Sequence, residues 1–600
     1  MAKEYYFEWV YELKAAPEAL WPLVSDKNRF NRDTGLTPMQ LLGIKNRVRR
    51  VKFQIPIVRV EWEEEPFEWT FPYRFGILRR YVTGPLKEMR VDCRLQRSDS
   101  GGTRINYQTW VTPRNIIGDI AIQIGIGIVA KKKFSDVFNL YDRIASRGDP
   151  VYAIQIGKHL SSSGLSRFKT ISEKLKNEGA DQYALEHIYD YLQKADDLSI
   201  QRIRPYALAD GWSLPRRTVL ETFLKATRAG MFDMFWDLLC PECRGVAEDF
   251  GKLSDLKGTA HCSTCQIEFD ANFDQNVEVI FRPNPSVRTV NNEIEFCVGN
   301  PQRQPHIIFS MVVPANEQLP FGTMLNAGRY RLKVPGLTGF QFVQAGEQGA
   351  EKRDFRTSDL NLQNNNILDI SLTPYIRLMN ETNQTQTFQL EHLAWSDQAA
   401  TAADVTTLQV FRDLFSSEVL RPGEEISVGS TTLMFTDLRN STKLYREIGD
   451  APAFGRVREH FEILEVAVAS EGGAIIKTMG DAVMAAFRKP VSSVKAIWKV
   501  QKELEKRGVP PLAIKIGIHY GPCIVVNLND RLDYFGSTVN IAARLPNFSN
   551  GGEAIFTEAI RNDPEVLQYL EKNAPPNSLT RFQSELRGFD RSIDLWRIKL

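Results

Sequence analysis

The first 113 residues alternate hydrophobic and polar positions in short runs, which is the pattern of strands with one buried face. The run Tyr5–Leu13 is rich in aromatic residues, a short helix is expected over 17–25, and strand-like runs continue to Val111. The apolar positions then change to a near-helical repeat over 115–146. The pattern therefore predicts a curved antiparallel sheet followed by one long helix.

The long helix is unusually apolar in its first half. Its apolar side chains are Ile116, Ile117, Ile120, Ile122, Ile124, Ile126, Ile128 and Val129. We expect them to pack on the sheet; the alternative is that they line a pocket for an apolar small molecule or lipid. The order of strand, short helices, sheet and long helix over residues 1–147 resembles the START-like helix-grip fold, and that resemblance implies an apolar cavity between sheet and helix.

Residues 148–235 have a helical pattern, clearest over 166–178, 182–195 and 215–230. The last two helices could form a winged-helix-like unit. Its candidate DNA-binding side chains would be Arg202, Arg204, Arg216 and Arg217. The charge around these arginines is mixed rather than a basic stripe, so we expect no nucleic-acid partner.

Four cysteines in residues 236–268 form two Cys-x-x-Cys pairs, Cys240 with Cys243 and Cys262 with Cys265. Each pair offers two thiolates from one tight turn, which suits tetrahedral Zn²⁺. The spacing resembles a zinc ribbon. Four protein ligands leave no open coordination position, so we expect the zinc to be structural.

Short strand-like runs separated by Gly, Pro and Asn fill residues 269–395, beginning with Val277–Phe281, and predict an antiparallel β-sandwich. Residues 396–429 form a linker. A helix is expected to begin near Ser396, to carry Leu408, Phe411, Leu414 and Phe415 on one side, and to end at Pro422–Gly423.

Three phrases in the last third of the chain carry the candidate chemistry. Asp437 follows the apolar run 432–435, and Asp481 lies with Gly480 between two apolar runs that predict a hairpin. Two carboxylates at strand ends are a common way to hold Mg²⁺ beside phosphates. The third phrase places Asn540 and Arg544 four residues apart, on one face of a predicted helix.

With Lys477 and Asp533, these residues make residues 430–600 resemble a class III nucleotide cyclase catalytic domain, which implies a ferredoxin-like α/β fold. In this family the two aspartates, with the carbonyl of Leu438, hold two Mg²⁺ or Mn²⁺ ions per active site. Lys477 and Asp533 select the base, Asn540 orients the ribose, and Arg544 stabilises the transition state. The resemblance implies formation of a 3′,5′-cyclic monophosphate and pyrophosphate at a homodimer interface.

Substrate and phosphate contacts follow from these positions. Lys477 donates and Asp533 accepts, which matches the N1 and N6 atoms of adenine and favours ATP over GTP. Backbone amides at the start of the helix after Asp437 are expected to cradle phosphates; these belong to Arg439, Asn440, Ser441 and Thr442. Arg587 is a further candidate phosphate contact. The glycine-rich arm that contacts the partner subunit in this family is replaced here by the shorter segment 522–532.

Composition bounds the remaining alternatives. The 600 residues suggest several domains, giving a multidomain α+β chain, and the net charge of +2 implies no bulk attraction to nucleic acid or membrane. We expect no signal peptide and no membrane span, because the most apolar run, 116–130, is short of the ~18 residues needed and contains Asp119. The paired cysteines favour a cytoplasmic protein. A nucleotide-binding regulatory module without catalysis, or a cyclase for another nucleotide, is the rival to an adenylate cyclase.

Overall fold

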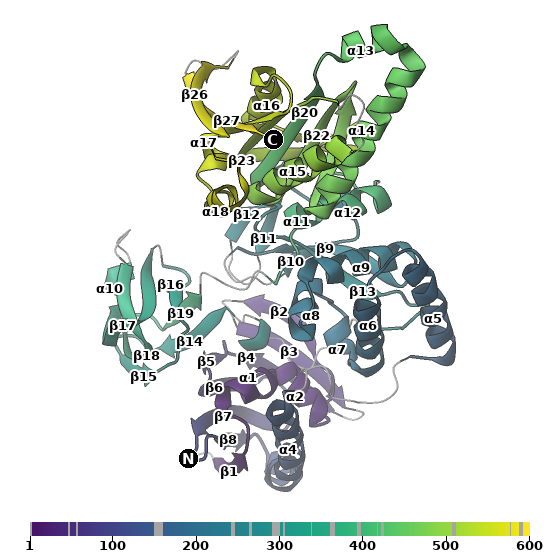
Figure 1. Cartoon of the computed structure of the whole chain (residues 1–600). Coiled ribbons are helices and arrows are strands. Elements are labelled where there is room, and N and C mark those ends of the chain that lie inside the picture. The colour runs from purple at the N-terminus through teal and green to yellow at the C-terminus, as the bar shows by residue number, and fades with distance from the viewer. Residues whose placement is uncertain are drawn as a thin grey trace.

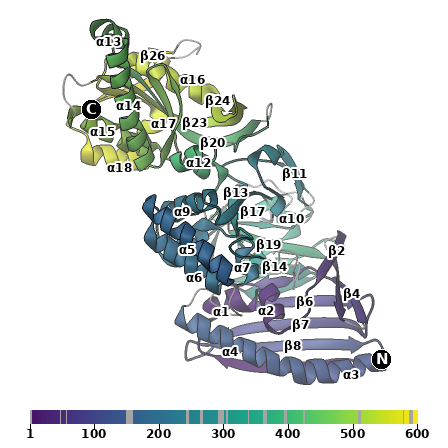
Figure 2. The same cartoon turned by 90° about the vertical axis from the view of Figure 1, so that its right-hand side faces the viewer.

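The chain is an elongated molecule with its N-terminal sheet at one end and its C-terminal domain at the other (Figure 1 and Figure 2). The computed structural model describes residues 3–45, 48–55, 58–148, 160–241, 246–262, 267–290, 301–303, 306–337, 339–360, 367–392, 398–416, 418–421, 425–506, 512–576, 578–586 and 592–600.

The N-terminal domain has the predicted order of elements. Its strands are β1 (Tyr5–Leu13), β2 (Gln40–Lys45), β3 (Val48–Ile55), β4 (Val58–Glu64), β5 (Glu68–Thr70), β6 (Arg74–Tyr81), β7 (Leu86–Arg97) and β8 (Thr103–Pro113). Its helices are α1 (Pro17–Val24), α2 (Lys27–Asp33), α3 (Ile116–Ala121), the π-helix η1 (Ile122–Ala130) and α4 (Lys131–Arg147). The strands pair in antiparallel fashion in the order β1-β8-β7-β6, and α3, η1 and α4 run on as one long helix across the sheet (Figure 2).

The isoleucine-rich part of this helix does not pack on the sheet as expected. Only Ile122 and Ile126 turn inward; the other six of the eight apolar side chains are exposed. We call Ile116, Ile120, Ile124 and Ile128, with the neighbouring Ile117 and Val129, the isoleucine stripe. The i→i+5 bonds of η1 widen its turn beyond the about 3.6 residues of an α-helix, so positions four apart stay on one side. Among the described residues, no helix combines the length and apolarity required to cross a bilayer.

The middle region joins helices to a small sheet. Its elements are α5 (Ser162–Asn177), α6 (Gln182–Lys194), α7 (Asp197–Ile200), α8 (Pro205–Trp212), α9 (Arg216–Arg228), β9 (Phe232–Leu239), β10 (Val246–Phe250), η3 (Leu253–Asp255), β11 (Thr259–Cys262), β12 (Ile267–Asp270) and β13 (Val277–Pro283). The prediction that the run Val277–Phe281 belongs to the β-sandwich is wrong. This run lies in β13, which pairs with β9 in the three-stranded sheet β10-β9-β13. An apolar strand pattern does not specify its partner, and β9 offers an edge close by in sequence.

Each arginine considered for DNA binding forms an ion pair with a carboxylate of the same chain. Arg204 contacts Glu278 at 2.6 Å, and Arg216 contacts Asp210 at 2.7 Å. Arg202 pairs with Asp237, and Arg217 with Glu221. These contacts favour the expectation of no nucleic-acid partner.

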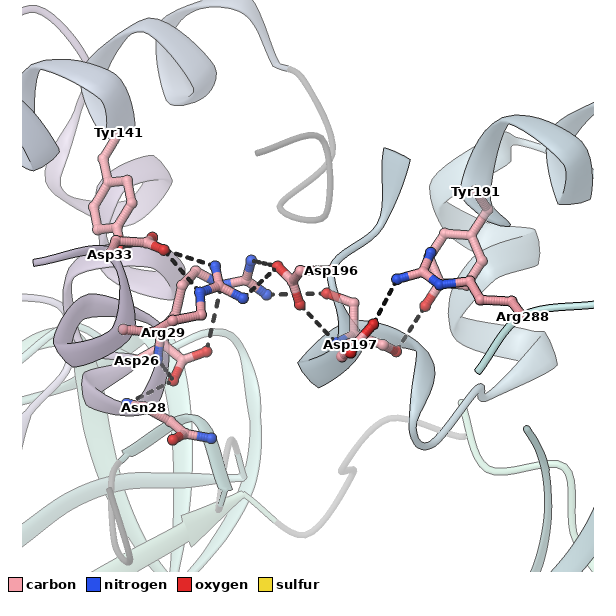
Figure 3. A network of polar contacts seen from close by, with 11 residues as sticks. Asp26, Asn28, Arg29, Asp33, Tyr141, Tyr191, Asp196, Asp197 and Arg288 are labelled. Atoms are coloured by element: carbon pink, nitrogen blue, oxygen red, sulfur yellow. Dashed lines mark hydrogen bonds and ion pairs between the residues drawn. The ribbon is translucent and has the colours of Figure 1, made fainter. Parts of the chain in front are cut away.

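A buried ionic network connects the N-terminal domain to the middle region (Figure 3). Arg29 and Arg32 of α2 place nitrogens 2.7 and 2.9 Å from the Asp196 carboxylate, which precedes α7. Burial raises the pKa of Asp196, but the two guanidinium charges outweigh it and hold the pKa below its usual range. On the other side of α7, Arg288 contacts Asp197 at 2.7 Å. The network fixes α2 against α7.

The β-rich region has its own core but shares a sheet with the N-terminal domain. Its elements are η4 (Pro301–Arg303), β14 (Ile307–Val313), β15 (Gln318–Gly322), β16 (Gly328–Lys333), β17 (Phe340–Arg356), α10 (Thr357–Leu360), β18 (Ile367–Met379) and β19 (Gln386–His392). The expected antiparallel pattern is broken where β17 and β18 pair in parallel. Strand β14 pairs with β19 on one side and with β5 on the other, where Phe309 lies opposite Thr70, so the strand path continues from one domain into the next.

The linker differs from the single helix expected. It contains two short helices, α11 (Ala402–Thr406) and α12 (Gln409–Leu414); Thr401 and Asp404 form a capping box that starts α11. The expected start at Ser396 and the expected stop at Pro422–Gly423 lie outside the described residues. Both helices lie directly beneath the C-terminal domain in Figure 1.

The C-terminal domain is an α/β unit built on one sheet. Its elements are β20 (Glu425–Leu438), α13 (Ser441–Ile448), α14 (Asp450–Ser470), β21 (Gly473–Met479), β22 (Ala482–Phe487), α15 (Pro490–Lys506), β23 (Ile514–Leu528), β24 (Arg531–Phe535), α16 (Ser537–Arg544), η5 (Leu545–Phe548), β25 (Glu553–Thr557), α17 (Glu558–Arg561), α18 (Pro564–Asn573), β26 (Leu579–Glu585) and β27 (Ser592–Lys599). The strand order is β21-β22-β20-β23-β25-β27-β26, with β24 paired to β23.

Both faces of this sheet are buried. One face, with Met434 and Val483, packs against α14, α15 and α18. The other face, with Leu433 and Phe435, belongs to a core that also contains residues of the linker and of the middle region, such as Phe411 and Trp236. We call this second core the shared core.

Candidate active site

The two aspartates come to the same end of neighbouring strands. In the pairing of β20 with β22, Thr436 lies opposite Val483, so Asp437 and Asp481 follow and precede that pair at the same edge. The predicted hairpin is confirmed: Gly480, with φ of 66°, and Asp481 form the turn between β21 and β22. The sequence therefore placed both carboxylates correctly at one strand edge.

The carboxylates have incomplete protein partners, as a cation site requires. The Asp481 Oδ2 atom is buried and has no hydrogen-bond partner in the described part of the chain. Asp437 is about one-third exposed and has the Lys515 Nζ atom 3.5 Å away. A buried carboxylate oxygen without a donor is costly unless a cation satisfies it. Oxygen donors of this kind fit Mg²⁺ or Mn²⁺.

A buried histidine that the sequence did not single out lies behind this edge. His460 of α14 is fully buried, and neither ring nitrogen has a hydrogen-bond partner among the described residues. Burial lowers its pKa to about 4, against the smaller opposing effect of the Asp481 charge. The ring is therefore neutral near pH 7. A single histidine in an amphipathic helix gives no sequence signal of such a position.

The expected phosphate cradle is narrower than predicted. Helix α13 begins at Ser441 after Asn440, whose φ of 59° turns the chain sharply. The Arg439 amide donates to the Ala513 carbonyl at 2.8 Å, so it is not available to a phosphate. The amides of Ser441 and Thr442 have no backbone partner in the described part and remain at the helix N-terminus, where anions are favoured.

Lys477 and Asp533, the two residues predicted to select the base, lie in contact. The Lys477 Nζ atom donates to the Asp533 Oδ2 atom at 2.5 Å. Asp533 is 4% exposed on β24, and its Oδ1 atom accepts from the Tyr534 amide at 2.8 Å. The two residues come from one chain although 56 positions separate them. They form a donor and an acceptor side by side.

Asn540 and Arg544 occupy one face of α16, one turn apart, and Arg544 is its last residue. Asn540 is exposed. Within the described part it makes no hydrogen bond with Asp437, Asp481, Lys477 or Asp533. The fold of one chain therefore brings Asp437 near Asp481 and Lys477 near Asp533, and in the described part no hydrogen bond joins Asn540 to either pair. Arg587 lies outside the described residues.

The unusual arm is a regular hairpin. Strand β23 continues to Leu528, the chain turns through Asn529 and Asp530, both with positive φ, and β24 returns with Asp533 opposite Val526. Two left-handed central residues are typical of a tight type I′ turn. The arm thus places Asp533 by strand pairing.

Linker contacts with this site were not predicted from the sequence. The Gln409 Oε1 atom accepts from the Ile475 amide at 2.8 Å, two residues before Lys477. Arg412 donates to the Leu532 carbonyl at 3.1 Å, next to Asp533. Arg488 contacts Asp404 of α11 at 3.0 Å and also pairs with Asp274 of the middle region. The linker therefore touches both strands that carry the base-selecting pair.

The cysteine site is described only in part. Cys240 and Cys262 are buried in one small cluster with Ile267 and Phe269. Cys243 and Cys265 lie outside the described residues. One cysteine from each predicted pair thus lies in the same place.

Comparison with known proteins identifies two segments. Residues 424–570 match the family "Adenylate and Guanylate cyclase catalytic domain", and residues 166–307 match a family of unknown function, DUF5939. The adenylate cyclase of Lachancea kluyveri is 29% identical over 194 residues, which cover 28% of this chain and 10% of that protein. Adenylate cyclase 1 of Rhizobium meliloti is 30% identical over 132 residues, covering 19% of this chain and 20% of that protein. The chain spans a tenth to a fifth of the length of these two curated relatives.

Solved structures match a part of the chain. The adenylyl cyclase CyaB from P. aeruginosa is 23% identical, with 29% of this chain and 95% of that chain covered and a TM-score of 0.24. An adenylate/guanylate cyclase/hydrolase from Silicibacter pomeroyi is 21% identical, with 30% and 99% covered and a TM-score of 0.25.

Proposed function

Because residues 424–570 form a class III nucleotide cyclase catalytic domain, we propose that the chain is an adenylate cyclase that converts ATP to 3′,5′-cyclic AMP and pyrophosphate. The observation that carries the choice of ATP is the contact between Lys477 and Asp533. Adenine offers an acceptor at N1 and a donor at N6, so Lys477 donates to the first and Asp533 accepts from the second. Guanine presents the opposite pattern there and would leave both side chains unmatched.

The metal and phosphate contacts complete the proposal. Asp437, Asp481 and the Leu438 carbonyl would hold two Mg²⁺ or Mn²⁺ ions, and the unpartnered Asp481 Oδ2 atom supports this. When bound, the ions neutralise the triphosphate and make the ribose 3′-hydroxyl easier to deprotonate. The amides of Ser441 and Thr442 would receive phosphate oxygens. Arg587 would add a phosphate contact.

The active site is proposed to form between two chains. Asn540 would orient the ribose and Arg544 would stabilise the negative charge that develops on the α-phosphate. In this arrangement one chain gives Asp437 and Asp481 to one site, and gives Lys477, Asp533, Asn540 and Arg544 to the other. Within the described part of one chain, Asn540 makes no hydrogen bond with either aspartate, which supports such sharing. The homodimer would then be required for activity.

The test is incubation of the pure full-length chain with each of the four ribonucleoside triphosphates and Mn²⁺ or Mg²⁺. We expect cyclic AMP from ATP and far less product from the others. The Asp437→Ala variant serves as the inactive control. ATP binding without cyclic product in the wild type would favour the rival function, a regulatory nucleotide-binding module. A cyclic product from a different triphosphate would show that this triphosphate, rather than ATP, is the substrate.

The front part is proposed to be regulatory, in the predicted segments 1–147, 148–235, 236–268, 269–395 and 396–429, except that Val277–Phe281 joins the sheet of the middle region. The order of elements in residues 1–147 supports a START-like helix-grip domain. Between the helix and the sheet, the centre of the Phe134 ring lies 4.9 Å from that of Phe30 and 5.0 Å from that of Tyr107. This filling favours core packing there over an enclosed apolar ligand.

Structural zinc and a cytoplasmic location are further parts of the proposal. The burial of Cys240 beside Cys262 supports a four-cysteine zinc site completed by Cys243 and Cys265. Two Cys-x-x-Cys pairs without a disulfide framework suit a reducing compartment.

A further inference from the structure

The isoleucine stripe is an apolar surface that the described chain leaves uncovered. The exposed fractions of its side chains are 78% for Ile116, 69% for Ile117, 56% for Ile120, 55% for Ile124, 68% for Ile128 and 44% for Val129. Single exposed apolar residues are ordinary, but a contiguous row of this kind marks an interaction surface. The stripe therefore requires an explanation beyond folding.

The orientation of the stripe is fixed by contacts on the inner side of the helix. Ile122 is fully buried and Ile126 packs on the core of the N-terminal domain. The Tyr5 hydroxyl donates to Asp119 at 2.8 Å and accepts from Gln123 at 3.0 Å, which ties α3 and η1 to β1. Rotation of the helix to bury the stripe would break these contacts and expose Ile122.

The stripe is bounded by positive charge. Lys131, Lys132 and Lys133 follow it and are exposed, and the exposed Arg114 precedes it. The one carboxylate between them, Asp119, is bonded to Tyr5 and lies 3.7 Å from Lys3. The surface thus combines β-branched apolar side chains with unbalanced cationic charge.

The position of the stripe in the molecule leaves it accessible. The helix runs along the outer side of the N-terminal domain, at the end of the molecule farthest from the C-terminal domain (Figure 2). A flat partner could therefore reach the whole stripe without displacing another element.

We propose that the isoleucine stripe and the three lysines dock the protein on the surface of an anionic lipid bilayer. A helix that lies in the interface inserts its apolar side chains between headgroups, while flanking lysines contact lipid phosphates and carboxylates. An anionic bilayer surface therefore accounts for both the exposed apolar side chains and the neighbouring lysines. This docking is interfacial and needs no spanning helix.

A second copy of the same surface is the weaker match. Antiparallel contact of two stripes would bring the lysines of one copy against Arg114 of the other, and parallel contact would bring lysines against lysines. Both arrangements place like charges together, which disfavours the contact. Charge therefore selects an anionic partner.

The test is flotation of the full-length protein with vesicles of phosphatidylcholine alone or of phosphatidylcholine with phosphatidylserine. We expect binding to the anionic vesicles that weakens as salt is raised. The variant Ile120→Ser/Ile124→Ser/Ile128→Ser should lose binding by on the order of a hundredfold, because three apolar contacts are removed. Lys131→Gln/Lys132→Gln/Lys133→Gln should weaken binding by about fivefold per lysine.

Two controls keep the result interpretable. Ile367→Ser removes an isoleucine that is 46% exposed on β18, far from the stripe in sequence, and should bind vesicles as the wild type does. The melting temperature of the stripe variant should stay within a few degrees of the wild type, since its three positions are exposed.

The proposal is overturned if the wild type binds neither vesicle, or if the stripe variant binds anionic vesicles as tightly as Ile367→Ser does. Self-association that depends on the stripe, measured by sedimentation without vesicle binding, would overturn it in favour of contact between two copies. None of these outcomes depends on the proposed cyclase activity.

Discussion

The guanidinium of Arg412 in the linker donates a hydrogen bond to the carbonyl of Leu532, the residue immediately before Asp533. Arg412 is itself held by the Thr406 carbonyl at 2.8 Å, and its guanidinium lies 5.8 Å from the centre of the Tyr534 ring. Through Arg412, the linker thus contacts β24 at Leu532 and Tyr534, the residues on either side of Asp533. A shift of α12 would move Asp533 relative to Lys477.

Arg412 is therefore expected to act as a positioning residue. Arg412→Ala should lower kcat/KM for ATP by about tenfold, comparable to the loss of a hydrogen bond from a charged donor. It should also reduce the ATP:GTP preference, which a general loss of folded protein would leave unchanged. Arg421→Ala is the matched control, because Arg421 is another linker arginine whose guanidinium binds a carbonyl, that of Ser254 at 2.6 Å. Equal ATP:GTP ratios in both variants would contradict this role.

Base choice should reside in the ion-paired couple Lys477 and Asp533. Lys477→Glu with Asp533→Cys removes the donor and acceptor that match adenine. Turnover of ATP should fall by about a hundredfold or more, while turnover of GTP should change much less. Initial rates with the two nucleotides, measured at saturating metal, give the ratio. An unchanged ratio would remove these residues from base selection.

Shared active sites predict complementation. Asp437→Ala and Arg544→Ala should each be nearly inactive, because each pure dimer lacks one group in both sites. After subunit exchange, a heterodimer would carry both lesions in one site and none in the other. Activity should recover to about a quarter of the wild type, since half the dimers are mixed and each has one intact site. Mixtures that stay inactive after exchange is verified by differently tagged chains would rule out sharing.

The cysteine cluster should contain zinc. Elemental analysis of the full chain should find about one zinc per chain. Cys262→Ser should lower the metal content and the melting temperature, because structural zinc contributes directly to folding. The buried Cys93, which belongs to neither pair, provides the control: Cys93→Ala should retain zinc. If wild-type protein stripped of zinc melted at the same temperature as untreated protein, the prediction of a structural zinc site would be contradicted.

Acid should destabilise the catalytic domain through His519. Burial lowers its pKa from 6.5 to about 4, and its Nδ1 atom lies 2.8 Å from the Thr557 hydroxyl oxygen. The unfolded chain binds the proton first, so stability is complete above the unfolded pKa and declines as pH falls from 6.5 toward 4. His519→Gln should flatten this decline by about 1 kcal/mol per pH unit in chemical denaturation. Parallel curves for both proteins would exclude His519 as the cause.

Much of the site could be predicted from the sequence because its residues follow local patterns. Asp437 and Asp481 sit where apolar runs end, and strand pairing alone brings them to one edge. The contact between Lys477 and Asp533 needed the family resemblance, since 56 positions separate them. The amide of Arg439 was assigned wrongly because its pairing with Ala513 depends on a strand far along the chain.

The remaining differences arise from contacts between distant segments. The pairing of β5 with β14 and the placement of β13 depend on which sheet edge is free, and an alternating pattern carries no such information. The prediction that the isoleucines of the long helix pack on the sheet failed for another reason. Ile122 and Ile124 are the same residue type, but Ile122 is buried and Ile124 is exposed. A helix that is apolar on all sides gives no direction to its buried face.

The shared core has a consequence for how this protein loses activity. Leu433 of the catalytic sheet, Phe411 of the linker and Trp236 of the middle region belong to one apolar cluster, and the rings of Phe411 and Trp236 lie 6.1 Å apart at 90°. We therefore expect these segments to unfold together, although the two family matches, residues 166–307 and 424–570, are separate in sequence. We expect a substitution of Trp236 to lower the quantity of folded protein, because its side chain is fully buried in the shared core. The stability of the C-terminal domain would then depend on side chains that lie outside the residues matching the cyclase family.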